Sequence, residues 1–173
     1  AGLGSAAVAV IVGETGCGKT HLLNALVDGA RADGWKCLNV QGVESEAVLS
    51  GAGLLAVLSP LRGGLGSVPE AQAEALSAAL GWGPASGPGD RFLVGAATLS
   101  LLAAGSGHAP LLIGVDDVQW VVVESAEALA FAARRLGHDR VAVVMTHRVG
   151  TRILVSLDGF ESISVEGLAS AAA

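Results

Sequence analysis

The amino-acid sequence predicts an α/β domain of three layers, in which helices cover both faces of a parallel five-stranded sheet. Two observations predict this class. Short apolar runs rich in β-branched residues, which suit strands buried on both faces, alternate along the chain with segments of helical periodicity. The chain has 173 residues, of which 51% are hydrophobic, and this length suits one domain with its own aliphatic core. We therefore expect a single domain over residues 1–173.

The first forty residues predict a parallel unit of strand, loop, helix and strand. The run "AAVAVIV" (6–12) is apolar throughout and predicts a buried strand. A glycine-rich loop follows, and apolar residues then recur at helical spacing over residues 22–30, with Gly34 as a stop signal. The run "KCLNV" (36–40) predicts the second strand. Two strands joined through a helix in this way lie parallel in one sheet.

The rest of the chain predicts a helical insertion and three more strands. Residues 46–104 give no strand signal, so we expect helices between the second and third strands. The best marked is "SVPEAQAEALSAALG", in which Ser67 and Glu70 stand at capping-box spacing. Strands are expected in "PLLIGVDD" (110–117), "VAVVMT" (141–146) and the shorter "SISV" (162–165). Acidic residues at its start and basic residues at its end predict a helix over residues 124–136.

Charge, cysteine spacing and hydropathy exclude several classes of protein. The net charge of −6 leaves no clustered basic surface for a nucleic-acid backbone, so we expect no direct nucleic-acid binding by this chain. Cys17 and Cys37 have no metal-ligand spacing, and we expect free thiols in a reducing cytoplasm. The longest uncharged run, residues 92–115, is broken by glycines and Pro110, so no membrane span is predicted. The expected location is cytoplasmic, away from any membrane.

The glycine-rich loop carries the clearest chemical signal. The segment "GETGCGKT" (13–20) fits the spacing G-x-x-x-x-G-K-[ST] at every specified position. Such a loop directs backbone N–H groups toward a phosphate, which requires glycine where a Cβ would be strained or in the way. We predict that the phosphates of a nucleotide are held by Gly13, Glu14, Thr15, Gly16, Cys17, Gly18, Lys19 and Thr20. Lys19 is expected to reach the β- and γ-phosphates, and the Thr20 hydroxyl to ligate Mg²⁺. The alternative is a glycine turn with an exposed lysine, but a position between a buried strand and an amphipathic helix favours phosphate binding.

Two carboxylates follow the predicted third strand. Parallel sheets bind ligands at the carboxyl ends of their strands, where Asp116 would supply the outer carboxylate that Mg²⁺ on a triphosphate requires. Asp117, one residue further on, would orient or deprotonate an attacking water. The alternative is that both are solvated acids that cap the next helix.

An arginine follows the predicted fourth strand. Arg148 would contact the γ-phosphate and so distinguish ATP from ADP, the alternative being a solvated side chain. Trp120, close to the two carboxylates, is expected to be a packing residue rather than a platform for a base. The candidate catalytic residues are therefore Asp117 and Arg148, and the candidate metal ligands are Thr20 and Asp116.

Six segments spread over most of the chain form a wider pattern. They are "VGETGCGKTHLL", "GVESEAVLSGAGLLAVLSPL", "VPEAQAEALSAALG", "DRFLVGAATLSLLA", "LLIGVDDVQW" and "SAEALAFAARRL". Together they resemble the nucleotide-binding domain of large LuxR-type transcriptional regulators, which belong to the signal-transduction NTPases of the AAA-like P-loop class. The resemblance implies ATP and Mg²⁺ as ligands, a sheet in the order 5-1-4-3-2, and a nucleotide switch in a signal-responsive regulator. It also implies that the lid, sensor and DNA-binding regions lie outside this chain.

The sequence departs from the pattern of that family at one point. An aspartate usually stands two positions after the tryptophan, whereas here Trp120 is followed by Val121, Val122 and Val123. The expected activity is Mg·ATP binding with slow hydrolysis. A non-hydrolysing nucleotide-binding module or scaffold is the first alternative, and the valine run is the hint for it. A small-molecule phosphotransferase is the second, although residues 46–104 show no arginine-rich lid sequence. Self-association that depends on the nucleotide is a further possibility, and the sequence does not indicate which effector the domain responds to.

Overall fold

The computed structural model of the chain describes residues 7–47, 49, 51–84, 90–151 and 155–167. The five strands within these residues form one parallel sheet in the order β2-β3-β4-β1-β5. They are β1 (Ala7–Gly13), β2 (Lys36–Gln41), β3 (Leu111–Asp116), β4 (Val141–Arg148) and β5 (Glu161–Val165). The expected order 5-1-4-3-2 is this same order read from the other edge, so the predicted fold class is confirmed.

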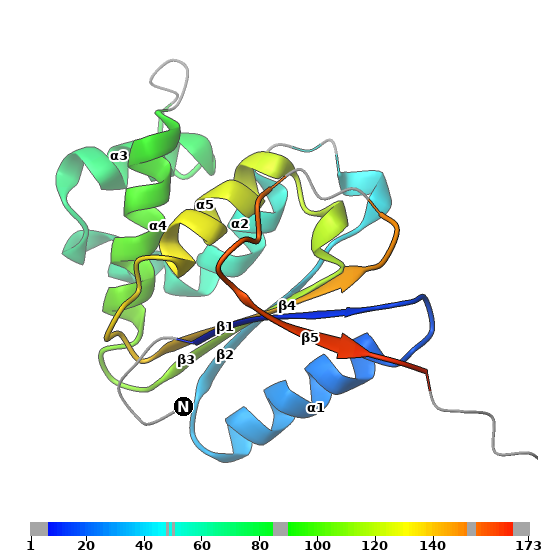
Figure 1. Cartoon of the computed structure of the whole chain (residues 1–173). Coiled ribbons are helices and arrows are strands. Elements are labelled where there is room, and N and C mark those ends of the chain that lie inside the picture. Colours follow the sequence, from blue (N-terminus) through cyan, green and yellow to red (C-terminus); the bar gives the residue numbers. More distant parts are fainter. Residues whose placement is uncertain (1–6, 48, 50, 85–89, 152–154, 168–173) are drawn as a thin grey trace, which may run out of the picture.

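Helices cover both faces of the sheet, which makes the three predicted layers (Figure 1). Helix α1 (Lys19–Ala32) lies on one face, where Leu23 and Val27 pack on Leu112 of β3. On the other side lie α2 (Ala52–Leu58), α3 (Glu70–Ala79), α4 (Arg91–Gly105) and α5 (Val123–Ala133). A larger cluster of buried aliphatic residues joins these helices to the sheet. Within the described part of the chain, no helix combines the length and apolar character needed to cross a membrane.

The helical insertion between β2 and β3 is confirmed. It contains α2, α3 and α4 together with the 3-10 helix η2 (Ser59–Ser67), and a short 3-10 helix, η1 (Glu44–Glu46), precedes them. The expected capping box is wrong, because Ser67 ends η2 and Pro69 is the N-cap of α3, without a side-chain cap. A proline disfavours helical backbone angles in the residue before it. Val68 is accordingly extended, with φ −94° and ψ 140°. A helix capped by Ser67 would have to include Val68.

The carboxyl ends of β1, β3 and β4 meet at one edge of the sheet, since all the strands are parallel. Strand β4 lies between β1 and β3 and continues past residue 146, its predicted end, to Arg148. Gly13 at the end of β1 is the register partner of Arg148. A third 3-10 helix, η3 (Val118–Trp120), connects β3 to α5. Residues that are far apart in the sequence therefore gather at this edge.

Candidate functional site

The glycine-rich loop runs from the end of β1 to the start of α1. Gly16 and Gly18 have φ angles of +79° and +95°, a region that is strained for residues with a Cβ. At Gly13, a Cβ would lie 2.5 Å from the carbonyl oxygen of Val165 and 2.6 Å from Sγ of Cys17. Gly18 is also the N-cap of α1, so the positive end of that helix dipole faces the loop. The backbone path of the loop thus depends on glycine at all three positions.

Lys19 is the first residue of α1, and only 7% of its surface is exposed. Its Nζ donates hydrogen bonds to the carbonyl oxygens of Gly13 (3.1 Å) and Glu14 (2.7 Å), and lies 3.8 Å from Sγ of Cys17. An ammonium group that is desolvated to this degree needs such acceptors. Lys19 is therefore not an exposed turn lysine, because its charge is held against the backbone of the loop.

Asp116 ends β3 with 5% of its surface exposed, and its two carboxylate oxygens have different partners. Oδ2 accepts a hydrogen bond from Oγ1 of Thr20 (2.8 Å), which joins the two predicted metal ligands. Oδ1 accepts from Oγ1 of Thr146 (2.5 Å), a fully buried residue near the end of β4. Asp116 is therefore neither solvated nor a helix cap. The role of Thr146 was missed by the sequence analysis, although a hydroxyl at the end of a neighbouring strand was a usable signal.

Asp117 has a φ angle of +51°, which among the described residues makes it the one non-glycine with a left-handed backbone. Its Oδ1 accepts a hydrogen bond from Nε2 of Gln119 (2.8 Å). Oε1 of Gln119 in turn accepts from the backbone N–H of Arg148 (3.3 Å). Gln119 therefore connects the two predicted catalytic residues, and the sequence analysis did not find it. Asp117 does not cap α5, whose N-cap is Val122, and makes no side-chain cap bond to η3.

His147 lies next to these groups on β4. Burial lowers its pKa below 6.5, and the charge of Lys19 lowers it further, while Asp117 acts in the opposite direction. Its Nε2 lies 3.3 Å from Oγ1 of Thr151. The lowered pKa favours the uncharged imidazole beside Lys19.

A cavity of about 560 Å³, here called the loop cavity, opens where these residues meet. Of the predicted site residues, those that line it are Thr15, Gly16, Gly18, Lys19, Thr20, Asp117 and Arg148. Asp116 is not among them, because it is buried and reaches the site through Thr20. Gln119 and Trp120 also line the cavity. The side chain of Arg148 is exposed, and its contact with a phosphate stays a prediction.

The oxygen donors at the loop cavity suit a hard cation. The Thr20 hydroxyl and the Asp116 carboxylate are adjacent, and Mg²⁺ in nucleotide sites uses few protein oxygens, taking its other ligands from phosphate and water. Among the residues that the structure describes, no group of three His, Cys, Asp or Glu side chains is placed to hold a metal ion alone. The residues present therefore fit a magnesium ion that arrives with its phosphates, and Thr20 and Asp116 would hold it.

Comparison with protein families decides what kind of domain this is. The family of AAA ATPase domains matches residues 1–144. The chain belongs to this family. AAA ATPase domains bind and hydrolyse nucleotides, typically with Mg²⁺, so the family supports the ligand class predicted from the loop. The narrower resemblance to LuxR-type regulators is not part of this finding.

Comparisons with individual proteins add less to the AAA ATPase assignment. No curated protein matches the chain. Among solved structures, the cytoplasmic domain of the Type VII secretion ATPase EccC of Thermomonospora curvata is similar, with 14% sequence identity and a TM-score of 0.45. The similar region covers 83% of this chain and 16% of that chain. The chain thus corresponds in length to a small part of that protein.

Proposed function

We propose that this AAA ATPase domain binds Mg·ATP in the loop cavity and hydrolyses it slowly. The observation that carries the proposal is the hydrogen bond between Thr20 and Asp116, which brings two oxygen ligands of the type that Mg²⁺ prefers to the end of the glycine loop. Membership of the AAA ATPase family supports a nucleotide as the ligand.

Each part of the site has a distinct role in this proposal. The backbone N–H groups of the loop and the N-terminus of α1 surround the phosphates, and Lys19 exchanges carbonyl partners for phosphate oxygens. Mg²⁺, when bound, neutralises phosphate charge. Asp117, oriented by Gln119, takes a proton from the attacking water. Arg148 offsets the charge of the γ-phosphate, but water screens it because it is exposed, which favours slow turnover.

A regulatory setting is part of the same proposal. The resemblance to LuxR-type regulators supports a role as the nucleotide switch of a signal-responsive transcriptional regulator, a single cytoplasmic domain that does not itself contact nucleic acid. A switch requires an interaction that differs between ATP and ADP. We expect that difference to arise through Arg148, because among the phosphates it would contact only the γ-phosphate, which ADP lacks.

Isothermal titration with Mg·ATP tests the binding step. The chain has two lysines, Lys19 and Lys36, and Lys36 is exposed at the start of β2, so Lys36→Ala is a matched control. Because the ammonium loses its charge-assisted contacts, we expect Lys19→Ala to weaken binding by about tenfold to a hundredfold or more. Lys36→Ala should bind as the parent does. Thermal unfolding establishes that both variants are folded. Equal affinities in all three proteins would overturn the assignment of the loop.

Measurement of phosphate release tests the hydrolysis step. Asparagine tolerates the left-handed backbone of residue 117 but cannot take up a proton, so Asp117→Asn preserves the local structure. Nucleotide affinity should persist, and turnover should fall by about 10² to 10⁴ for the loss of a general base. Unchanged turnover would remove Asp117 from the mechanism. A parent protein that binds Mg·ATP without releasing phosphate would instead support the non-hydrolysing module.

A further inference from the structure

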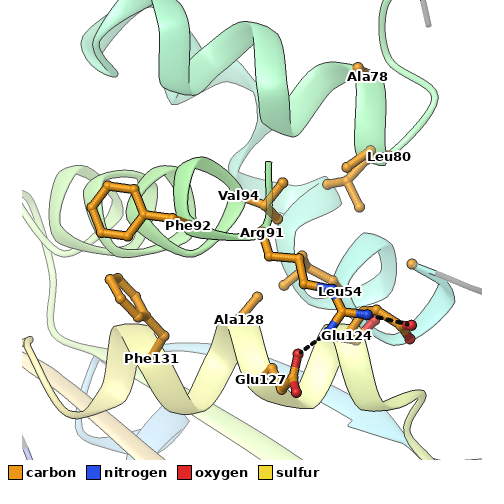
Figure 2. A pocket seen from close by; sticks show the side chains of 13 residues that line it. Leu54, Ala78, Leu80, Arg91, Phe92, Val94, Glu124, Glu127, Ala128 and Phe131 are labelled. Carbon is orange, nitrogen blue, oxygen red and sulfur yellow. Dashed lines mark hydrogen bonds and ion pairs between the residues drawn. The ribbon is translucent and has the colours of Figure 1, made fainter. Parts of the chain in front are cut away.

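A second cavity lies among the helices on the opposite side of the sheet from α1. It has a volume of about 530 Å³ and lies between α2, α3, α4 and α5 (Figure 2). We call it the helical pocket. None of its lining residues lines the loop cavity, so the proposed nucleotide site does not account for it. Pockets that take small molecules have volumes of about 300 to 1,000 Å³, and the helical pocket falls within that range.

The walls of the helical pocket are mainly apolar. They are formed by Leu54 of α2, Leu80 after α3, Val94 of α4 and Ala128 of α5. At one end Phe92 meets Phe131 edge to face, with ring centroids 5.8 Å apart and ring planes at 86°. Phe92 is nevertheless 64% exposed. Apolar surface left in contact with water is available for a ligand to cover.

The other end of the helical pocket is ionic. Figure 2 shows Arg91 reaching from α4 across to two carboxylates of α5. Its Nη1 lies 3.3 Å from Oε2 of Glu127, and its Nη2 lies 3.4 Å from Oε1 of Glu124. One guanidinium faces two carboxylates, so this end has an excess of one negative charge. An anionic ligand would be repelled here, whereas an uncharged ligand would not.

Ser125 supplies a polar group to the pocket lining. The residue is 1% exposed, and its Oγ has no hydrogen-bond partner within the described part of the chain. A buried hydroxyl without a partner destabilises the folded state. The Oγ atom is closed to solvent as it stands, so rotation about the Cα–Cβ bond is needed to turn it toward the cavity that Ser125 lines. In that rotamer the hydroxyl would either donate to or accept from one polar group of a ligand.

We propose that the helical pocket binds a small uncharged molecule with a largely apolar, ring-containing body and one hydrogen-bonding group. The apolar walls and the aromatic pair select the body, the excess negative charge at the ionic end disfavours anions, and the Ser125 hydroxyl, rotated toward the cavity, pairs with the polar group. This site goes beyond the proposed nucleotide function and does not depend on it.

The fluorescent probe N-phenylnaphthylamine has this chemistry, because it joins two apolar ring systems through a single N–H group. Titrated into the parent protein without nucleotide, it is expected to bind saturably with one probe for each chain. Anilinonaphthalenesulfonate has the same skeleton with an added sulfonate, and we expect it to bind severalfold more weakly, because the excess negative charge is partly screened by water. The absence of saturable binding by the neutral probe, or a preference for the sulfonate, would overturn the proposal.

Substitutions on α3 locate the probe. Ala79 and Ala71 are both exposed alanines of this helix, but Ala79 lines the pocket and Ala71 does not. Ala79→Trp should therefore weaken probe binding at least tenfold, whereas Ala71→Trp should leave it unchanged. Ser125→Ala should weaken it severalfold while the protein stays folded. Equal probe binding by Ala79→Trp and the parent would show that the probe lies elsewhere and overturn the proposal.

Two further measurements test whether the probe binds in the loop cavity instead, and whether a second copy of the chain fills the helical pocket. Lys19→Ala should bind the probe as the parent does, because the two cavities share no residue. Loss of probe binding in that variant would put the probe in the loop cavity and overturn the proposal, whether or not ATP binds. Light scattering of the parent and Ala79→Trp tests whether a second copy of the chain occupies the pocket. A dimer that is lost in Ala79→Trp and competes with the probe would overturn the small-molecule assignment.

Discussion

Two polar side chains, Thr146 and Gln119, organise the carboxylates at the end of β3. The Thr146 hydroxyl donates to Asp116 and accepts from the backbone N–H of Asp117, so one buried group holds both aspartates. Gln119 ties the Asp117 side chain to the backbone of Arg148 on β4. A left-handed backbone at a non-glycine residue persists where its surroundings hold it, and these bonds are the ones that hold Asp117.

Arg148→Ala should bring the ATP and ADP affinities closer together, chiefly by weakening ATP. A charge-assisted hydrogen bond to the γ-phosphate contributes about 1.5 to 3 kcal/mol, which is about tenfold to a hundredfold in affinity. Because Arg148 is exposed, we expect a change near the lower figure. Isothermal titration with both nucleotides measures the ratio, and Arg31→Ala, which removes an exposed arginine of α1, is the control. An unchanged ratio in Arg148→Ala would exclude this residue as the γ-phosphate sensor.

His147 should make the folded state less stable in mild acid. The pKa of His147 is lower in the folded protein than its unfolded value of 6.5. Its contribution to the free energy of unfolding is therefore fully present above pH 6.5 and is lost as the pH falls below that value. The half-buried ring is partly screened by solvent, so the loss should stay below about 1 kcal/mol per pH unit. Urea unfolding measures the free energy of unfolding, which should fall less between about pH 7.5 and 5.5 in His147→Gln than in the parent. The control is His108→Gln, which removes an exposed histidine and should lose as much stability as the parent. The same pH dependence of unfolding in all three proteins would contradict the lowered pKa of His147.

At the scale of elements, α4 and α5 begin in different ways. Oδ1 of Asp90 caps α4 by accepting from the backbone N–H groups of Phe92 (2.8 Å) and Leu93 (3.3 Å). Helix α5 begins after Val122, which has no side-chain cap and is 8% exposed. Val122 therefore gives α5 apolar burial at its start and no side-chain cap. The valine run 121–123 does not line the loop cavity, and its last two residues form the start of α5, Val122 as the N-cap and Val123 as the first helical residue.

Asp90→Ala should destabilise the protein through the loss of this cap. Removal of an N-cap acceptor lowers the free energy of unfolding by about 1 kcal/mol, which for a chain of this size corresponds to about 2 to 4 °C in melting temperature. Thermal and urea unfolding measure the change. Asp33→Ala is the matched control, because Asp33 is an exposed aspartate at the other end of a helix, the C-cap of α1. A loss of stability as large in Asp33→Ala would mean that capping is not the cause.

At the scale of the whole molecule, the parallel order of the sheet makes the candidate site. Strand β4 separates β1 from β3, so the glycine loop and Asp116 approach from either side of Thr146. The helical pocket is lined by residues of α2, α3, α4 and α5. These helices lie on one side of the sheet (Figure 1). The loop cavity at the strand ends and the helical pocket are therefore separate, since they share no lining residue.

Mg·ATP should stabilise the whole fold, because a ligand that binds only the native state shifts the unfolding equilibrium. At a concentration of about 100 times Kd, the gain is about 2.7 kcal/mol. In Asp116→Asn this gain should lose its dependence on Mg²⁺, because the carboxylate charge that would hold the ion is removed. Thermal unfolding with ATP, with and without a chelator, makes the comparison. The same Mg²⁺ dependence in Asp116→Asn and the parent would remove Asp116 from the metal site.

Much of the fold could be predicted from local patterns. The five strands lie close to the predicted runs, because continuous apolar segments with β-branched residues have few other stable arrangements in a buried sheet. The starts of helices were harder to predict. The spacing of Ser67 and Glu70 is that of a capping box, but it is also compatible with a 3-10 turn before a proline. The gathering of Asp116 with Thr20 was predicted as well, because the loop motif and the strand ends both indicate the same edge.

The sequence by itself determined the strand, loop and helix order and the glycine positions of the loop, because each of these depends on local spacing. It also indicated that Thr20 and Asp116 would lie near each other, because the carboxyl ends of parallel strands share one edge of the sheet. Only the tertiary structure decided that Thr146 orients Asp116, that Gln119 links Asp117 to Arg148, and that the insertion encloses a second cavity. These contacts join residues from different elements. They depend on which strands are neighbours and how helices pack, and no local spacing in the chain encodes such distances.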